Sequence, residues 1–278
     1  MNAQDIGVVS VDNGGHSTCV VTKNNEEMFF SVKGLYGERT LTTTNGKHDF
    51  VVEYLDEKYV MGNLGRYDCA MPIEMHTKSK QHLFYDLSTL VGIHQYGFSS
   101  NYLISSVPIK MHNDNEKSGI IERLRKTHTI TVNGITRTFT IDDVKIAPES
   151  AVAYWLKEPK GKTRWLDLGS RTINFSTTLN EDGIIRFIDT ESGTFFGKGL
   201  EALDEQYNAK GLADYIYGRL IKIWNVDDKI YLLGGGCFDE SLILFIKKYF
   251  ANAEVMENPK MANAKAMYRL GVNAFGIY

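Results

Sequence analysis

The sequence has few cysteines, no long apolar run and no excess of positive charge, and each shortage excludes a class of protein. Its three cysteines, Cys19, Cys69 and Cys237, are odd in number and widely separated, so they indicate neither a disulfide framework nor a zinc site. No apolar run approaches the ~18 residues that a membrane-spanning helix needs. Because 31 Lys and Arg stand against 34 Asp and Glu, no overall basic field points to direct binding of nucleic acid.

The composition that remains is typical of a globular protein of roughly two domains. Of the 278 residues, 43% are hydrophobic and 23% are charged, which excludes disorder as the main state, collagen-like repeats and a membrane channel. The polar start, Met1 to Asp5, does not resemble a signal peptide. We therefore expect a cytoplasmic protein without direct membrane contact.

One strand pattern occurs twice in the chain. Each copy is a buried strand that ends in an Asp-x-Gly turn, followed by a second strand, a polar turn and a third strand. The first copy has its turn at Asp12-Asn13-Gly14-Gly15, with strands at 6–12, 18–23 and 28–32. The second has its turn at Asp167-Leu168-Gly169-Ser170, with strands at 164–167, 172–178 and 184–189. Coincidence is the alternative, because such turns are common, but their equivalent settings favour a duplication.

The rest of the chain alternates helices with strands, which predicts an α/β fold. Apolar periodicity predicts helices at 77–94, 114–126, 240–250 and 263–271, one that begins near Glu149, and two between 190 and 228. Further strands are expected at 102–107 and 229–233, and the pairs Asn45-Gly46 and Asn133-Gly134 predict tight hairpins. No linker rich in Pro, Gly or Ser separates the halves, so we expect them to share an interface.

The glycine turns suggest a site for a polyphosphate. A glycine turn between two strands exposes backbone N–H groups that can point at phosphate oxygens. Asp12 and Asp167 would repel such a ligand unless a hard divalent cation lies between them, and Mg²⁺, held largely through water, suits this role. Gly234-Gly235-Gly236 follows a strand and precedes a helix, so it allows close approach of a ligand, although a simple tight turn is the alternative.

Five segments resemble motifs of the actin/Hsp70/sugar-kinase superfamily, in the family's order and together spanning the chain. Asp12-Asn13-Gly14 looks like the first phosphate loop, Leu166 to Thr172 like the second, and Leu232 to Gly236 like the adenosine motif. Ala147 to Ala151 and Asn258 to Tyr268 are similar to the first and last connecting helices of bacterial plasmid-segregation actins. The combination is most like the ParM group.

This resemblance implies a duplicated, ribonuclease H-like actin fold of two domains. Domain I would be 1–148, with subdomain IA and a small IB inserted at about 30–70; domain II would be 149–262, and the helix at 263–278 would return to domain I. The resemblance assigns catalysis to Glu149, which orients the attacking water, and to Asp167; a solvated glutamate at a helix N-terminus is the alternative for Glu149. Mg²⁺ would be bound through water by Asp12 and Asp167. The nucleotide, ATP or GTP, would be bound by Asp12, Gly14, Gly15, His16, Ser17, Gly169, Ser170, Arg171, Thr172, Gly234, Gly235 and Gly236.

The sequence departs from the ParM group at two places. The lysine that usually follows the first phosphate loop is replaced at about Cys19, so a hydroxyl or the imidazole of His16 is the expected substitute, with a plain surface histidine as the alternative. Residues 190–228 are too few for the usual subdomain IIB, which is therefore missing or vestigial, as in the AlfA-like branch. Base selectivity is expected to be loose as a result.

The resemblance implies a filament-forming ATPase that segregates plasmid DNA. It would assemble with itself and act through an adaptor protein bound to centromere-like plasmid DNA, which suits the net charge of −3. A small-molecule kinase of the same superfamily is the alternative, but no aspartate near 105–108 or beside Glu149 is suited to be the acceptor's base. A nucleotide-binding scaffold without turnover is a third possibility.

Overall fold

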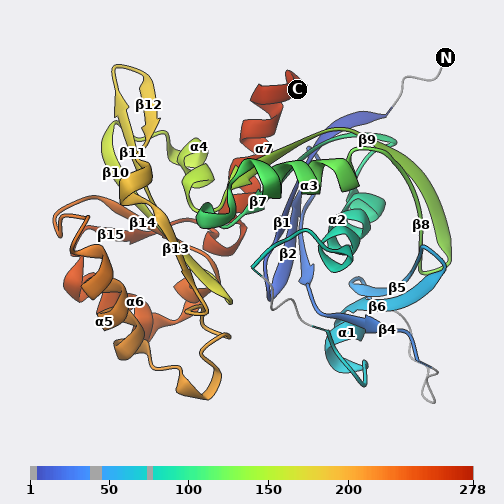
Figure 1. Cartoon of the computed structure of the whole chain (residues 1–278), viewed down its shortest axis with the longest axis horizontal. Helices are drawn as coiled ribbons and strands as arrows, with labels where there is room; N and C mark the ends of the chain where they lie inside the picture. Colours follow the sequence, from blue (N-terminus) through green and yellow to red (C-terminus); the bar gives the residue numbers. More distant parts are fainter. Residues whose placement is uncertain (1–4, 38–45, 74–77, 278) are drawn as a thin grey trace. The chain divides into compact units, whose positions relative to one another are not determined.

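The structure, a computed structural model, describes residues 5–37, 46–73 and 78–277 (Figure 1). The chain divides into two units. Unit 1 comprises residues 1–106, 113–146 and 271–278, and unit 2 comprises residues 107–112 and 147–270. The predicted hairpin around Asn45-Gly46 falls partly outside the described residues.

Within the described residues, one nine-stranded sheet belongs essentially to unit 1. Its strand order is β3-β2-β1-β7-β9-β8-β5-β6-β4. The strands are β1 (Ile6–Asn13), β2 (Ser17–Val21), β3 (Glu26–Phe30), β4 (Lys33–Leu35), β5 (Asp49–Tyr54), β6 (Glu57–Gly62), β7 (Ser100–Val107), β8 (Thr127–Val132) and β9 (Ile135–Pro148). Because β1 pairs in parallel with β7, their carboxyl ends lie at the same edge of the sheet.

Helices cover this sheet, and α2 packs most deeply. They are α1 (Asn63–Tyr67), α2 (Leu83–Tyr96) and α3 (Asp114–Leu124). Helix α2 starts where His82 accepts a hydrogen bond from the Tyr85 N–H at 3.2 Å, a side-chain cap that satisfies one free donor of the first turn. Gly92 allows close packing on the sheet, because a Cβ there would lie 2.8 Å from Val20.

Unit 2, all of whose residues are described, contains a six-stranded sheet. Its order is β12-β11-β10-β14-β15, and β13 also pairs with β11. The strands are β10 (Gly161–Leu168), β11 (Thr172–Glu181), β12 (Ile184–Phe187), β13 (Gly193–Phe196), β14 (Ile230–Leu233) and β15 (Ala253–Val255). The helices are α4 (Tyr154–Lys157), α5 (Ala209–Leu220), α6 (Glu240–Tyr249) and α7 (Ala262–Phe275), whose last residues, from Gly271, group with unit 1.

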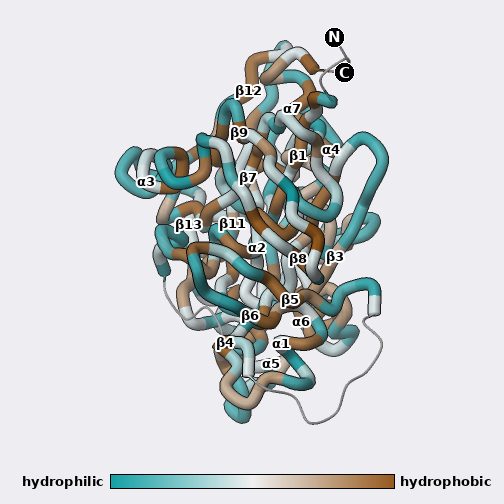
Figure 2. Tube along the Cα trace, turned by 90° about the vertical axis from the view of Figure 1, so that its right-hand side faces the viewer, coloured by the Kyte–Doolittle hydropathy of each residue, from teal (hydrophilic) through white to brown (hydrophobic). Residues whose placement is uncertain are grey.

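An apolar cluster joins the unit 2 sheet to α5 and α6. Leu166 and Leu232 on the central strands, Ile216 on α5 and Ile246 on α6 are all at most 1% exposed and belong to this cluster. Burial of such side chains contributes about 1.5–3 kcal/mol each, so the cluster stabilises this sheet substantially. In Figure 2 apolar residues, drawn brown, gather along the strands, while polar residues, drawn teal, gather in the connecting segments.

The predicted elements agree with the structure where the prediction depends on a few neighbouring residues. The Asn133-Gly134 hairpin is confirmed, with φ of 51° and 78° in the left-handed region that a tight hairpin needs. Two expectations are wrong. Residues 190–228, where two helices were expected, hold one α-helix, α5, together with strand β13 and the 3₁₀ turns Asp189–Glu191 and Asp204–Gln206. Glu149 starts no α-helix, because the 3₁₀ turn Ala151–Ala153 intervenes before α4.

Lys33 in β4 is fully buried, and its burial makes the stability of unit 1 depend on pH. Its ammonium donates hydrogen bonds to the Phe84 carbonyl and, at 2.6 Å, to Ser88 Oγ. Burial lowers the pKa of Lys33 from 10.5 to about 7, although Asp86 partly opposes the shift. Between these two values the unfolded chain binds more protons than the folded chain, so stability rises with pH.

We expect the free energy of unfolding to increase from pH 7 to pH 9.5, by about 3 kcal/mol. Lys33→Met should remove most of this increase and stabilise the protein at pH 7, because no buried ammonium then has to lose its proton. Urea unfolding across this pH range measures the effect. Lys58→Met, at a side chain that is 44% exposed, is the matched control and should keep the wild-type slope. An equal slope in wild type and Lys33→Met would contradict the prediction.

Candidate functional site

The two Asp-x-Gly turns have the same geometry in the two units. Gly14 N–H donates to the Ser17 carbonyl at 3.0 Å, and Gly169 N–H donates to the Thr172 carbonyl at 3.1 Å. A Cβ would lie 2.9 Å from the acceptor oxygen at Gly14 and 2.7 Å at Gly169, so both positions require glycine. The predicted duplication is therefore confirmed at the level of individual hydrogen bonds.

The duplication extends beyond the turns, because the strand pairs that flank them have the same register. Asp12 lies opposite Cys19 in the β1–β2 pair, and Asp167 lies opposite Asn174 in the β10–β11 pair. Each aspartate is thus followed, seven residues later, by the residue that faces it across the pair. The position expected for a lysine holds Cys19, which is 3% exposed.

In unit 1 the Asp12 carboxylate lies in a polar group at the carboxyl edge of the sheet. Ser106 Oγ, near the end of β7, donates to Asp12 Oδ1 at 2.8 Å. The Lys80 ammonium donates to the Ser106 carbonyl at 3.1 Å, and Lys80 is only 8% exposed. Asn13 Nδ2 donates to Thr89 Oγ1 on α2 at 2.8 Å, which anchors the start of the turn. A buried cation and this carboxylate therefore share Ser106 as a hydrogen-bond partner, although the turn itself carries no lysine.

The other predicted residues of unit 1 lie in the same turn. His16 is half-buried, and its ring meets the ring of Phe30 edge-on at 5.3 Å. Gly14 and Gly15 are half-buried, and Ser17 is buried at the start of β2. The structure thus gathers Asp12, Gly14, Gly15, His16 and Ser17 in one short segment.

In unit 2 the Asp167 carboxylate is fixed from two sides. Asn263 Nδ2 donates to Asp167 Oδ2 at 2.9 Å, and Asn263 Oδ1 accepts the Ser150 N–H at 3.1 Å. Gly234 has φ of 88°, and a Cβ there would lie 2.4 Å from Asp167 Oδ1. The first glycine of the triplet is therefore required both by its backbone conformation and by its distance from this carboxylate.

Glu149 is buried next to the same group. It is 8% exposed, its N–H donates to the Val107 carbonyl at 2.9 Å, and its Oε2 accepts a hydrogen bond from Asn174 Nδ2 at 2.8 Å. Ser150, which follows it, has φ of 67°, a conformation that costs of order 1–3 kcal/mol for a residue other than glycine. The alternative of a solvated helix-terminal glutamate does not hold. Its catalytic role stays a prediction.

The remaining predicted residues of unit 2 form the second turn and the glycine triplet. Gly169, Ser170, Arg171 and Thr172 are half-buried, and the backbone of residues 199–202 donates to carbonyls of this turn. Gly235 is exposed and Gly236 is buried. The structure thus gathers Glu149 and Asp167 around Asn263 and Asn174, with Gly234 against Asp167.

Four residues of these groups escaped the sequence reasoning: Lys80, Ser106, Asn174 and Asn263. Three of them lie far in sequence from the carboxylates they serve, so no local spacing relates them to those carboxylates. Asn263 does belong to the segment 258–268 that resembles the last connecting helix. The sequence could have pointed to Asn174 as a site residue. The duplication aligns it with Cys19, the position where a phosphate-binding lysine was expected.

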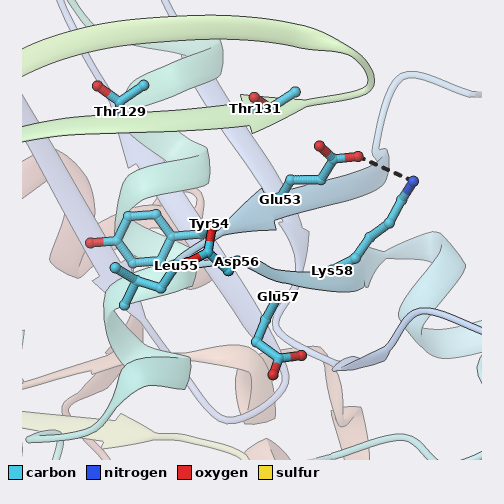
Figure 3. Close-up of a pocket in the computed structure, with 8 residues that line it drawn as sticks. All are labelled: Glu53, Tyr54, Leu55, Asp56, Glu57, Lys58, Thr129 and Thr131. Atoms are coloured by element: carbon cyan, nitrogen blue, oxygen red, sulfur yellow. Dashed lines mark ion pairs between the residues drawn. The ribbon is translucent and has the colours of Figure 1, made fainter.

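A pocket of about 330 Å³ lies elsewhere in unit 1, at the β5–β6 hairpin and β8 (Figure 3). Its lining includes Glu53 and Lys58, which form an ion pair at 3.1 Å, and the exposed Leu55 at the tip of the hairpin. None of the predicted site residues lines it.

Two further absences concern only the described part of the chain. There, no group of three or more His, Cys, Asp or Glu side chains is arranged to hold a metal ion by itself. A magnesium ion bound with a polyphosphate needs only one or two carboxylates, since phosphates and water supply its other ligands. No helix in these residues is long and apolar enough to cross a membrane.

Solved structures with the same fold include ParM, AlfA and an archaeal actin homologue. ParM in a 15-stranded filament from Clostridium botulinum has a TM-score of 0.80 at 14% identity, over 97% of this chain and 99% of that chain. AlfA from the Bacillus subtilis plasmid pLS32, in a filament, has 0.74 at 17%, over 96% and 98%. The archaeal actin homologue Ta0583, in complex with ADP, has 0.74 at 17%, over 96% and 99%. No curated protein matches.

The family comparison agrees with the fold. The model for the N-terminal domain of actin-like proteins matches residues 10–151, half of the chain, including the first Asp-x-Gly turn and Glu149. The structural likeness extends over nearly the whole chain and shows a two-domain actin-like fold. The chain therefore belongs to the family of actin-like proteins.

Proposed function

We propose that this chain is a cytoplasmic, filament-forming nucleotide hydrolase that segregates plasmid DNA. It binds ATP or GTP with Mg²⁺, assembles with itself and hydrolyses the nucleotide in the filament. An adaptor protein bound to plasmid DNA connects the filament to its cargo. The net charge of −3 supports an adaptor, because it gives the chain no general attraction for DNA.

The observation that carries this proposal is the coupling of Glu149 to Asp167 in unit 2. Asn174 lies opposite Asp167 across the strand pair and hydrogen-bonds to Glu149, and Asn263 bonds to both Asp167 and the Ser150 backbone. A carboxylate suited to a metal ion and an acceptor suited to water are therefore each held by an asparagine, and the asparagine that holds Glu149 lies in register with Asp167. Hydrolysis of a phosphoanhydride needs this kind of positioning more than a strong base.

The residues present fit a magnesium nucleotide. Asp12 and Asp167 offer hard oxygen ligands, and the required glycines at 14, 169 and 234 keep side chains away from the turns and from Asp167. The bound Mg²⁺ would neutralise charge on the phosphates. Asp12 and Asp167 would hold it through water, the turn amides of each unit would bind phosphate oxygens, and Glu149 would accept a proton of the attacking water in a hydrogen bond.

The relatives support assembly into filaments, a link to plasmids and nucleotide binding. Both ParM and AlfA are described as filaments, AlfA comes from a plasmid, one AlfA filament holds AMPPNP and Ta0583 holds ADP. We assign unit 1 to domain I, with the part at about 30–70 as subdomain IB, and unit 2 to domain II without IIB. The single helix between β13 and β14 supports this reduced form.

Phosphate release as a function of protein concentration tests the proposal. With Mg-ATP or Mg-GTP, the rate per molecule should be low in dilute solution and rise above a threshold concentration, because hydrolysis belongs to the filament. A rate per molecule that is independent of concentration and rises with added small-molecule acceptors would support the kinase alternative. No release with either nucleotide at any concentration would contradict the proposal.

A further inference from the structure

The β5–β6 hairpin of unit 1 ends in a turn whose conformation does not suit its sequence. Tyr54 pairs with Glu57, so Leu55 and Asp56 form a two-residue loop, and their φ values are 53° and 62°. Such a loop favours Asn and Gly, because a left-handed backbone strains a residue with a bulky side chain. Among the described residues other than glycine with positive φ, Leu55 is the one apolar residue; the others are Asp, Asn, Ser or Glu.

The side chain of Leu55 contributes little to the stability of a single chain. It is 68% exposed, so most of its apolar surface stays in water, while its backbone is strained. Asparagine at this position would relieve both costs. Strained residues cluster where a protein contacts a ligand or a partner, so we expect another molecule to cover Leu55.

The surroundings of Leu55 are acidic. Leu55 lines the pocket of Figure 3 together with Glu53, Asp56, Glu57 and Lys58. The ion pair between Glu53 and Lys58 neutralises one carboxylate, and Asp56 and Glu57, both exposed, leave this surface negative. A partner that covers Leu55 therefore needs an apolar surface bordered by positive charge.

Helix α6 of unit 2 carries a surface of this kind. Phe238, just before the helix, is 67% exposed, and Leu244 on the helix is 57% exposed. Lys248 follows Leu244 by four residues, so the two share one face of α6, whereas Ile246 points into the core. The Lys248 ammonium lies 4.9 Å from the centre of the Phe245 ring. The exposed face of α6 is therefore both apolar and basic.

We propose that Leu55 anchors the contact between copies of this chain, packing on α6 of the next copy against Phe238 and Leu244. This contact rests on the proposed function, in which the chain assembles with itself. Glu57 of one copy faces Lys248 of the next, so the charges of the two surfaces are complementary. The surfaces are different and belong to different units. The contact is consequently heterologous, and it repeats from copy to copy instead of closing as a two-fold dimer.

Leu55→Asn tests the anchor, because asparagine suits the turn but lacks the apolar surface. We expect the threshold concentration for sedimentation with Mg-ATP or Mg-GTP to rise about 10-fold or more. Affinity for Mg-nucleotide below the threshold should be unchanged, and the unfolding temperature of the monomer should be equal or higher. A purely structural role predicts a lower unfolding temperature. The matched control is Ile6→Thr on β1, 43% exposed, which should assemble as wild type.

An exchange of charges tests the pairing of the two surfaces. Glu57→Lys and Lys248→Glu should each raise the threshold concentration about 10-fold, because like charges then face each other. The two together should return the threshold to within about 3-fold of wild type. Lys160→Glu, at an exposed lysine in the turn before β10, is the control. Combined with Glu57→Lys, it should give no recovery.

The outcomes separate this contact from the proposed function. Leu55→Asn that assembles as wild type, or charge variants whose losses simply add, would overturn the contact while leaving nucleotide-dependent assembly intact. If Leu55→Asn does not fold, Leu244→Gln removes the apolar surface on the other side and should raise the threshold similarly. A wild type that never sediments with nucleotide would contradict the proposed function itself, and with it the contact.

Discussion

Glu149→Gln is expected to slow nucleotide hydrolysis by about 10²–10⁴-fold while the protein still binds nucleotide and assembles. The amide cannot accept the proton of water as the carboxylate does, whereas the backbone turns that are proposed to bind phosphate remain. Filaments of the variant should outlive those of the wild type, because hydrolysis no longer destabilises them. Phosphate release, nucleotide titration and light scattering measure the three effects.

Glu181→Gln is the matched control, since Glu181 is exposed at the end of β11 and belongs to neither group of site residues. It should behave as wild type. If Glu149→Gln instead fails to bind nucleotide, Glu149 has a structural role and the mechanism proposed here is wrong.

Asp167→Asn is expected to reduce hydrolysis on the order of 10³-fold and to remove the magnesium dependence of nucleotide binding. Asp167 is buried and held by Asn263, so the isosteric amide keeps the packing but lacks the charge that a magnesium ion requires. Fluorescent-nucleotide titration with magnesium and with a chelator measures the loss. Wild type should bind more tightly with magnesium, and the variant should bind equally in both.

Asp182→Asn controls for the loss of one negative charge. Asp182 lies in the β11–β12 turn with φ of 52°, a conformation that asparagine also tolerates, and it is exposed. Phosphate release at the wild-type rate in Asp167→Asn would refute the assignment of Asp167 to the metal ion.

The sequence predicts what local chemistry determines. The two turns were predictable because an aspartate at a strand end and a glycine two residues later specify a tight turn, and Gly14 and Gly169 make the same hydrogen bond. The Asn133-Gly134 hairpin was predictable for the same reason. Each of these features depends on fewer than ten consecutive residues.

The parts of the site that were missed depend on contacts between distant residues. Asn263 reaches Asp167 across 96 positions, and Ser106 reaches Asp12 across 94. No spacing rule within the sequence relates such pairs. The error between 190 and 228 has a similar cause: Gly193–Phe196 pairs with β11, and this partner, rather than local propensity, makes the segment a strand.

Sedimentation at high speed with and without Mg-ATP or Mg-GTP tests the central claim most directly. The protein should pellet only when nucleotide and magnesium are present, and only above a threshold concentration. Asp167→Asn should not pellet under conditions where Glu149→Gln pellets, because the first lacks the metal carboxylate and the second lacks only the acceptor for water. Wild-type protein that stays in the supernatant at high concentration with both nucleotides would contradict the claim that this actin-like protein forms nucleotide-dependent filaments.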